Sequence, residues 1–174
     1  MRLFPMTFSR LPRLLRAGAA GVAFLFALAS CSSDEPEDVL PERTVRITLR
    51  LDDAEYTHLQ NLGEFLEITS SRGLATAYLG VGGVLVVHSM VPLDPSVPFA
   101  AYDMACPYCY YRSDALPRPR VYALEGGMQA VCEECGSVYD ISQGFGNCID
   151  GPGSQLQVYH TVYSSYNRIL SVTN

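Results

Sequence analysis

Four cysteines in two C-x-x-C pairs are the residues of this chain best suited to chemistry. The pairs are separated by 22 residues and consist of Cys106, Cys109, Cys132 and Cys135. A C-x-x-C turn aims two sulfur atoms at one point, so two such turns can complete a tetrahedron of thiolates around one metal ion. Gly136 follows the second pair, where a tight turn often needs a positive φ angle. The pattern predicts a tetrathiolate metal site.

Three states of these thiols compete. Zn²⁺ fits the spacing best, because it accepts four sulfur ligands at about 2.3 Å and needs no open position in a structural role. Iron is the alternative, either as a rubredoxin-like ion or as a [2Fe–2S] cluster with four cysteine ligands. Disulfide pairing in an oxidising compartment is the third. With Cys31 set aside the thiols are odd in number, and we expect Cys148 to be a buried free thiol, or a disulfide partner if no metal binds.

Residues 1–30 are typical of a secretory signal peptide. A basic segment precedes an apolar stretch over 17–29, whose 13 residues are few for a membrane span. The sequence Leu28-Ala-Ser-Cys31 resembles a bacterial lipobox, which implies cleavage before Cys31 and a diacylglycerol group on its thiol. The other reading is an ordinary secretory signal with an incidental cysteine. Acyl chains on Cys31 would hold the protein at a membrane surface.

An acidic tether is predicted over 31–42, ahead of one domain over 43–174. Residues 32–38 are acidic and poor in apolar side chains, and they resemble the surface-export signal of some outer-membrane lipoproteins as well as a plain solvated spacer. Ser32, rather than Asp, follows the lipobox cysteine. By resemblance to the usual sorting rule, this implies the outer membrane of a bacterial envelope, with the domain facing the periplasm or the cell surface.

Charge narrows the range of partners. Beyond residue 31 the chain has 8 arginines and no lysine against 18 acidic residues, a net charge near −10. This balance argues against a nucleic-acid partner and against electrostatic binding to anionic lipid. Outside the tether the acidic residues are scattered, so they indicate no specific cationic partner.

The segments that must position the cysteines are short and rich in β-formers. Alternating or continuous apolar runs predict strands over 44–51, 61–69, 83–88, 99–103, 120–124, 128–131, 155–159 and 168–173. Three prolines make 91–98 a loop, and glycine-bracketed 74–79 has room for one helical turn. Short strands with frequent turns are typical of a sandwich or small barrel.

Residues 83–174 resemble the Rieske family in the order of their motifs. In that family a C-x-H box precedes a C-x-x-H box, which is followed by Gly-Ser, an aromatic–Asp pair and a Gly-Pro loop. The matching residues here are Cys106-Pro107, Cys132, Gly136-Ser137, Tyr139-Asp140, Gly144 and Gly151-Pro152. The resemblance implies an all-β fold, a β-sandwich base with a small zinc-ribbon- or rubredoxin-like subdomain over about 100–152. It also implies that Cys106 and Cys132 are ligands and that Tyr139-Asp140 packs under the metal loop.

The chain departs from the Rieske pattern at both histidine positions. Tyr108 occupies the first and Cys135 the second, while the histidines of the chain lie outside both boxes, at His58, His88 and His160. A two-His, two-Cys [2Fe–2S] centre is therefore not implied, and Cys109 and Cys135 are inferred as ligands from spacing. Iron at four thiolates would have a lower potential than a Rieske centre.

No catalytic signature accompanies the cysteines, so we expect a metal-binding structural or interaction module and not an enzyme. The alternative is an iron-dependent electron-transfer protein or oxidoreductase subunit. Four thiolates around a divalent ion leave a charge near −2, so Glu133 and Glu134 should face solvent. The cations available between the two pairs are Arg112, Arg118 and Arg120.

Overall fold

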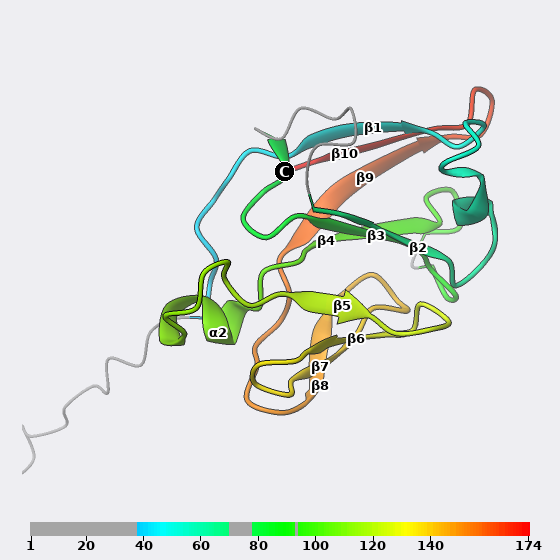
Figure 1. The fold of residues 1–174 in the computed structure, drawn as a ribbon. Helices are drawn as coiled ribbons and strands as arrows, with labels where there is room; N and C mark the ends of the chain where they lie inside the picture. Colours follow the sequence, from blue (N-terminus) through cyan, green and yellow to red (C-terminus); the bar gives the residue numbers. More distant parts are fainter. Residues whose placement is uncertain (1–37, 70–77, 93) are drawn as a thin grey trace, which may run out of the picture. The chain divides into compact units, whose positions relative to one another are not determined.

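Antiparallel strands dominate the computed structural model, which describes residues 38–69, 78–92 and 94–174 (Figure 1). One sheet has the order β1-β10-β9-β4-β3-β2, formed by Arg46–Arg50 (β1), Phe65–Ile68 (β2), Val84–His88 (β3), Phe99–Asp103 (β4), Val158–Ser164 (β9) and Ile169–Thr173 (β10). The second has the order β5-β6-β7-β8, formed by Val121–Ala123 (β5), Gln129–Cys132 (β6), Val138–Asp140 (β7) and Asn147–Asp150 (β8). The helices in the described ranges are short: Thr57–Gln60 (η2) and Pro107–Arg112 (α2). The predicted all-β class is confirmed.

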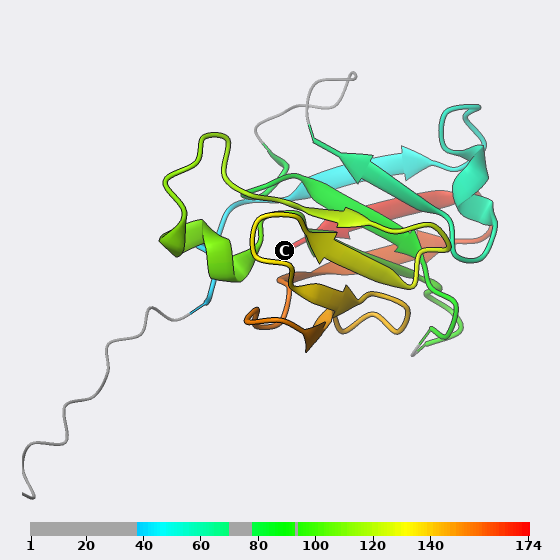
Figure 2. The same ribbon diagram turned by 60° about the horizontal axis from the view of Figure 1, so that its bottom comes forward.

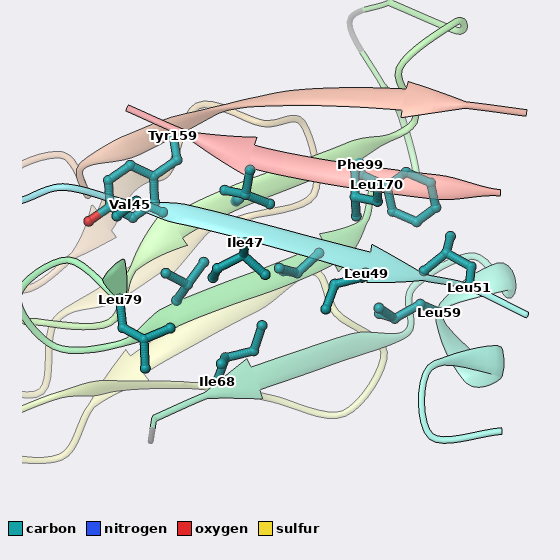
Figure 3. Packing of buried hydrophobic residues seen from close by; sticks show 14 residues of the cluster. Val45, Ile47, Leu49, Leu51, Leu59, Ile68, Leu79, Phe99, Tyr159 and Leu170 are labelled. Atoms are coloured by element: carbon teal, nitrogen blue, oxygen red, sulfur yellow. The ribbon is translucent and has the colours of Figure 1, made fainter. Parts of the chain in front are cut away.

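The six-stranded sheet curls around its own core (Figure 3). Strand β1 alternates as predicted, with Ile47 and Leu49 buried and its charged residues exposed. Strand β9 joins the two halves of the sheet, because residues 158–159 pair with β4 whereas residues 160–164 pair with β10. Ile47 and Leu49 therefore lie across from Ile68 of β2 within one apolar cluster. This core stabilises the base on which the cysteine loops sit.

The other face of β3 and β4 packs against the small sheet. Leu85 and Tyr102 from the large sheet share a buried cluster with Ala130, Tyr139 and Ile141 from the small-sheet region. Figure 2 shows the small sheet, yellow to orange, lying over the large one. The cluster also contains three of the cysteines, Cys106, Cys109 and Cys132. The cysteine loops are thus continuous with the core that joins the two sheets.

A fully buried carboxylate fixes the point where β4 delivers the chain to the first cysteine. Asp103 accepts hydrogen bonds from the N–H groups of Val81 (2.7 Å), Gly82 (2.9 Å) and Ala105 (2.7 Å) and from the Tyr159 hydroxyl. These four donors satisfy a group that would otherwise be costly to bury. The network ties the 80–82 loop and β9 to the chain three residues ahead of Cys106.

The predicted strands all overlap observed ones, but four of the described elements were missed: the short helices η2 and α2 and the strands β7 and β8. Helix α2 has six residues, too few to show a helical period, and it starts at a proline directly after Cys106. Strand β7 has three residues, and β8 is an edge strand with no buried residue, so neither carries an apolar alternation. Strand β9 begins at Val158, later than predicted, and runs on to Ser164.

The predicted tether ends earlier than residue 42. Leu40 is buried, the Ser154 hydroxyl donates to the Asp38 carbonyl (3.0 Å), and the Tyr111 hydroxyl donates to the Val39 carbonyl (2.8 Å). Residues 38–42 therefore belong to the domain, because an apolar side chain and two carbonyl contacts hold them there. The predicted signal peptide, Cys31, residues 31–37 of the predicted tether and most of the predicted 74–79 turn lie outside the described residues. Within the described ranges, no helix has the length and apolar character to cross a membrane.

Candidate metal centre

The four cysteine sulfurs converge on one point. All of them lie within 4.8 Å of one another. The Cys106 and Cys135 sulfurs are 3.7 Å apart, and the Cys109 and Cys132 sulfurs are 3.8 Å apart. A tetrahedron with metal–sulfur bonds of about 2.3 Å has edges of about 3.8 Å. The two distances between the pairs therefore match a single tetrahedral ion.

The first pair is positioned by α2. Cys106 is the extended residue just before the helix, and Pro107 at the first helical position starts it with a suitable φ. The Tyr110 N–H donates to the Cys106 carbonyl (2.9 Å), and the Cys109 N–H donates to the Cys106 sulfur. The Cys106 N–H donates to the Pro119 carbonyl (3.1 Å), so the segment that precedes β5 lies beside Cys106. One helical turn thus brings both sulfurs to the same side.

The second pair spans the end of β6, where Cys132 lies, and the tight turn to β7, where Cys135 lies. The Gly136 N–H donates to the Cys132 carbonyl (2.8 Å), and the Cys132 N–H donates to the Ser137 carbonyl (2.9 Å). Gly136 has φ +73°, as the sequence predicted, and an added Cβ there would meet no atom within 4 Å. Conformation rather than lack of space therefore calls for glycine at this position.

The close packing and burial of the thiols raise the pKa values of Cys106 and Cys109, whereas the pKa of Cys132 is lowered. Hydrogen bonding with Cys132, followed by burial, raises the pKa of Cys106 well above its ordinary value. Burial raises the pKa of Cys109 to about 12. The pKa of Cys132 falls to about 5, because its sulfur accepts hydrogen bonds from the Cys106 thiol and from the N–H groups of Cys135 and Glu134. One thiolate forms easily here, and a set of four requires a bound cation.

Two hydroxyl groups contact the sulfurs from behind. The Tyr139 hydroxyl is 3.5 Å from the Cys106 sulfur, and the Ser137 hydroxyl is 3.1 Å from the Cys135 sulfur. The Gly153 N–H donates to the Ser137 oxygen (2.9 Å), which leaves the Ser137 proton free to point at sulfur. Burial and the neighbouring Cys106 raise the pKa of Tyr139, so its phenol keeps its proton and donates. Such contacts orient and tune metal ligands.

The opposite side of the cluster opens to solvent. Cys135 is partly exposed, and the adjacent Glu133 and Glu134 are exposed, as predicted. A hollow of ≈ 360 Å³ is lined by Tyr108, Cys109, Arg112, Glu134, Cys135 and Pro152, among others. The Arg112 guanidinium lies over the Tyr108 ring, 4.1 Å from its centroid, and forms an ion pair with Asp38. Of the three arginines predicted to be available to the site, Arg112 lines this hollow together with Cys109 and Cys135, whereas Arg118 and Arg120 line another cavity.

The remaining residues singled out in the sequence lie elsewhere. His58 contacts the Phe65 carbonyl (3.2 Å), His88 contacts the Leu59 carbonyl (2.8 Å), and His160 is exposed on β9. The cysteines of the described segments are all free thiols, and sulfurs 3.7 Å apart are not bonded. Cys148 is half-buried, not buried as expected, because β8 is an edge strand; its thiol donates to the Asp150 carbonyl (3.2 Å).

Sequence reasoning missed the supporting residues of the site. Ser137 was visible only as part of a motif, Gly153 was not singled out, and Asp103 was visible only as the last residue of a strand. Their roles depend on contacts between segments far apart in the chain, which no local pattern reports. Tyr139 is the exception, since the resemblance placed it under the metal loop, where it is fully buried.

Comparisons with family models and with curated proteins assign the chain to no known family. No protein-family model matches the chain, and no curated protein matches its sequence. Fold and site together define an all-β protein with a cluster of four close cysteines that could bind a metal ion such as zinc or iron. The Rieske resemblance stays a prediction.

Proposed function

We propose that this protein is a membrane-anchored lipoprotein whose Rieske-like domain binds one Zn²⁺ in a structural or interaction role. The ligands are the thiolates of Cys106, Cys109, Cys132 and Cys135. The observation that carries the proposal is the convergence of the four sulfurs within 4.8 Å, at distances suited to one tetrahedral ion.

A structural role follows from what the ion would join. One pair of ligands belongs to α2 and the other to the turn between β6 and β7. The segment after α2, residues 114–118, is exposed throughout, so it contributes little apolar burial to hold α2 in place. A bound ion would tie α2 to the small sheet and neutralise part of the thiolate charge. Metal binding would then contribute directly to the folding free energy.

Sulfur spacing favours one ion over a two-iron cluster. In a [2Fe–2S] cluster each iron holds two cysteine sulfurs, so sulfurs on different irons lie farther apart than the edges of one tetrahedron. Every sulfur–sulfur distance in this cluster is at most 4.8 Å, which supports a site for a single metal ion. The Rieske centre itself does not fit, because Tyr108 and Cys135 replace its histidine ligands.

Elemental analysis of the purified full-length chain tests the proposal. One equivalent of zinc per chain and a colourless solution are the expected result. A preparation that binds no metal after reconstitution with Zn²⁺ under reducing conditions would contradict it, as would four cysteines oxidised to disulfides in the cell envelope.

A mononuclear-iron electron carrier or oxidoreductase subunit is the second candidate. It is favoured by the Tyr139 and Ser137 hydroxyls beside the sulfurs, since hydrogen bonds to sulfur tune the potential of iron–thiolate centres. The partly exposed Cys135 gives such a centre a route to a redox partner. Iron in the metal analysis, with visible absorption that bleaches on reduction, would establish this function instead of the zinc one.

The cellular location rests on the N-terminal sequence. The lipobox-like Leu28-Ala-Ser-Cys31 supports a lipid anchor, and Ser32 supports the outer membrane of a bacterial envelope. Labelling of cells with a radioactive fatty acid tests the anchor. Wild-type protein should carry the label and fractionate with outer membranes, whereas Cys31→Ala should carry none.

A further inference from the structure

A second cavity, of ≈ 250 Å³, lies at the base of the first cysteine loop. Its lining includes Arg43, Arg118 and Arg120, together with Tyr110 and the 80–82 loop, and no cysteine. Arg43 precedes β1, whereas Arg118 and Arg120 precede β5. Three of the eight arginines beyond residue 31 therefore meet at one cavity in an acidic chain.

These arginines lack acidic partners within the described residues. No acidic residue from these segments lines the cavity, and neither Arg43 nor Arg120 has an ion pair there. Arg118 donates to the Ser113 carbonyl and lies over the Tyr110 ring, 5.5 Å from its centroid, which leaves its charge uncompensated. Arginines that line one small cavity repel one another, and an anion between their guanidinium groups would relieve this repulsion.

The nearest buried carboxylate is already satisfied. Asp103 lies behind the 80–82 loop, and its oxygens accept four hydrogen bonds, two of them from the Val81 and Gly82 N–H groups. It therefore holds the wall of the cavity in place and forms no ion pair with the arginines in the described structure.

The cavity is held by contacts between three segments. The Gly80 N–H donates to the Thr44 carbonyl (3.4 Å), next to Arg43, and the Asn174 amide donates to the Arg43 carbonyl (3.3 Å). Arg120 forms a β-bridge with Ala105. The backbones that carry Arg43 and Arg120 are thus fixed before any ligand enters, which lowers the cost of binding.

We propose that this cavity binds one phosphate group, either free phosphate or the headgroup of a single phospholipid. The net charge of the chain argues against binding to an anionic lipid surface as a whole, whereas this site is a local cluster of arginines. Guanidinium groups offer paired donors that match the oxygens of a phosphate, and three of them offset its full negative charge. The site is separate from the cysteine cluster, so the inference does not rest on the identity of the metal.

Isothermal titration calorimetry on the full-length chain in detergent tests the proposal. One arm uses inorganic phosphate and the other uses glycerophosphoglycerol, the soluble headgroup of phosphatidylglycerol, both at constant ionic strength against chloride. Saturable binding of at least one probe is expected. Arg120→Gln and Arg43→Gln should each weaken it about tenfold or more, since each removes a charge-assisted pair. Arg50→Gln, an exposed position on β1 outside the cavity, should leave it unchanged.

The two probes distinguish the sources of the phosphate group. Preference for inorganic phosphate assigns the cavity to a free ligand, and preference for glycerophosphoglycerol assigns it to lipid. Absence of saturable binding to either probe overturns the proposal, and so does binding that Arg120→Gln and Arg43→Gln leave intact.

Metal analysis of the same samples keeps the two functions apart. If Arg120→Gln loses metal but still binds phosphate, the arginines serve the cysteine cluster and the phosphate proposal is wrong. If the wild-type chain binds phosphate but no metal, the zinc proposal fails and the phosphate site stands.

Discussion

The hydroxyl of Tyr139 lies 3.5 Å from the sulfur of Cys106, across 33 positions of sequence. Tyr139 belongs to the small sheet and Cys106 directly precedes α2, so this contact joins the two halves of the cysteine site. The aromatic ring fills the core between the sheets while its hydroxyl reaches the cluster. One residue therefore contributes both to packing and to the electrostatics of the sulfurs.

Loss of this hydroxyl should weaken metal binding and leave the fold intact. Tyr139→Phe keeps the ring in the core but removes the donor to Cys106, so we expect metal affinity to fall about 10-fold to 100-fold. Competition with a chromogenic chelator measures the change. Tyr122→Phe, at an exposed position on β5, serves as the matched control and should bind as wild type. Equal affinities for both variants would show that the hydroxyl has no role at the metal.

Replacement of one ligand should destabilise the domain, whereas replacement of the nearby free thiol should not. Cys109→Ser removes one of four sulfurs from a buried cluster, and we expect a loss of roughly 3 kcal/mol or more, seen as a Tm lower by roughly 10 °C, together with loss of metal. Cys148→Ser changes a half-buried thiol outside the cluster and should retain metal and Tm. Calorimetry and metal analysis on both variants give the comparison. A metal-free Cys109→Ser protein with the wild-type Tm would remove the structural role.

The buried carboxylate at the end of β4 should be more important than any surface acid. Asp103→Asn keeps the size of the side chain but places an N–H₂ group among four donors, so we expect a loss of about 2–4 kcal/mol in the free energy of unfolding. Urea denaturation measures it. Asp52→Asn breaks an exposed ion pair with Arg168 and should cost no more than about 1 kcal/mol. Similar losses in the two variants would contradict the network described for Asp103.

Alkaline pH should unfold the protein before its buried tyrosines ionise in the native state. Burial is the main cause that raises the pKa values of Tyr102, Tyr139 and Tyr159 far above the ordinary value of 10.0. Since a raised folded-state pKa stabilises the fold below pH 10 and that contribution is lost at higher pH, stability should fall as the pH rises above 10. Phenolate absorbance, recorded with circular dichroism, tests this. Ionisation of all eleven tyrosines while the native spectrum persists would refute it.

Much of the fold could be predicted from sequence, because its signals are local. The alternation over 44–51, the apolar run over 83–88 and the spacing of the two C-x-x-C pairs each report a structure within a few residues. Helix α2 and strand β8 escaped prediction, since one is too short to show a period and the other buries nothing.

The supporting contacts of the site could not be predicted for a different reason. Asp103 resembles an ordinary strand-terminal acid until the 80–82 loop and Tyr159 surround it. Ser137 acquires its orientation from Gly153, and an added Cβ at Gly153 would lie 2.4 Å from the Tyr139 hydroxyl and 2.8 Å from that of Ser137. Both arrangements depend on tertiary packing, which cannot be predicted from the residues next to Asp103 or Ser137 in the sequence.

The docking of residues 38–40 has a mechanical consequence. Asp38 and Val39 are held by Arg112, Tyr111 and Ser154, which lie in or near the loops that carry the cysteines. A pulling force applied through the preceding chain would therefore act first on α2 and reach β1 only after these contacts break. Tension at that end would load the segments beside the sulfur cluster before it loads the first strand of the large sheet.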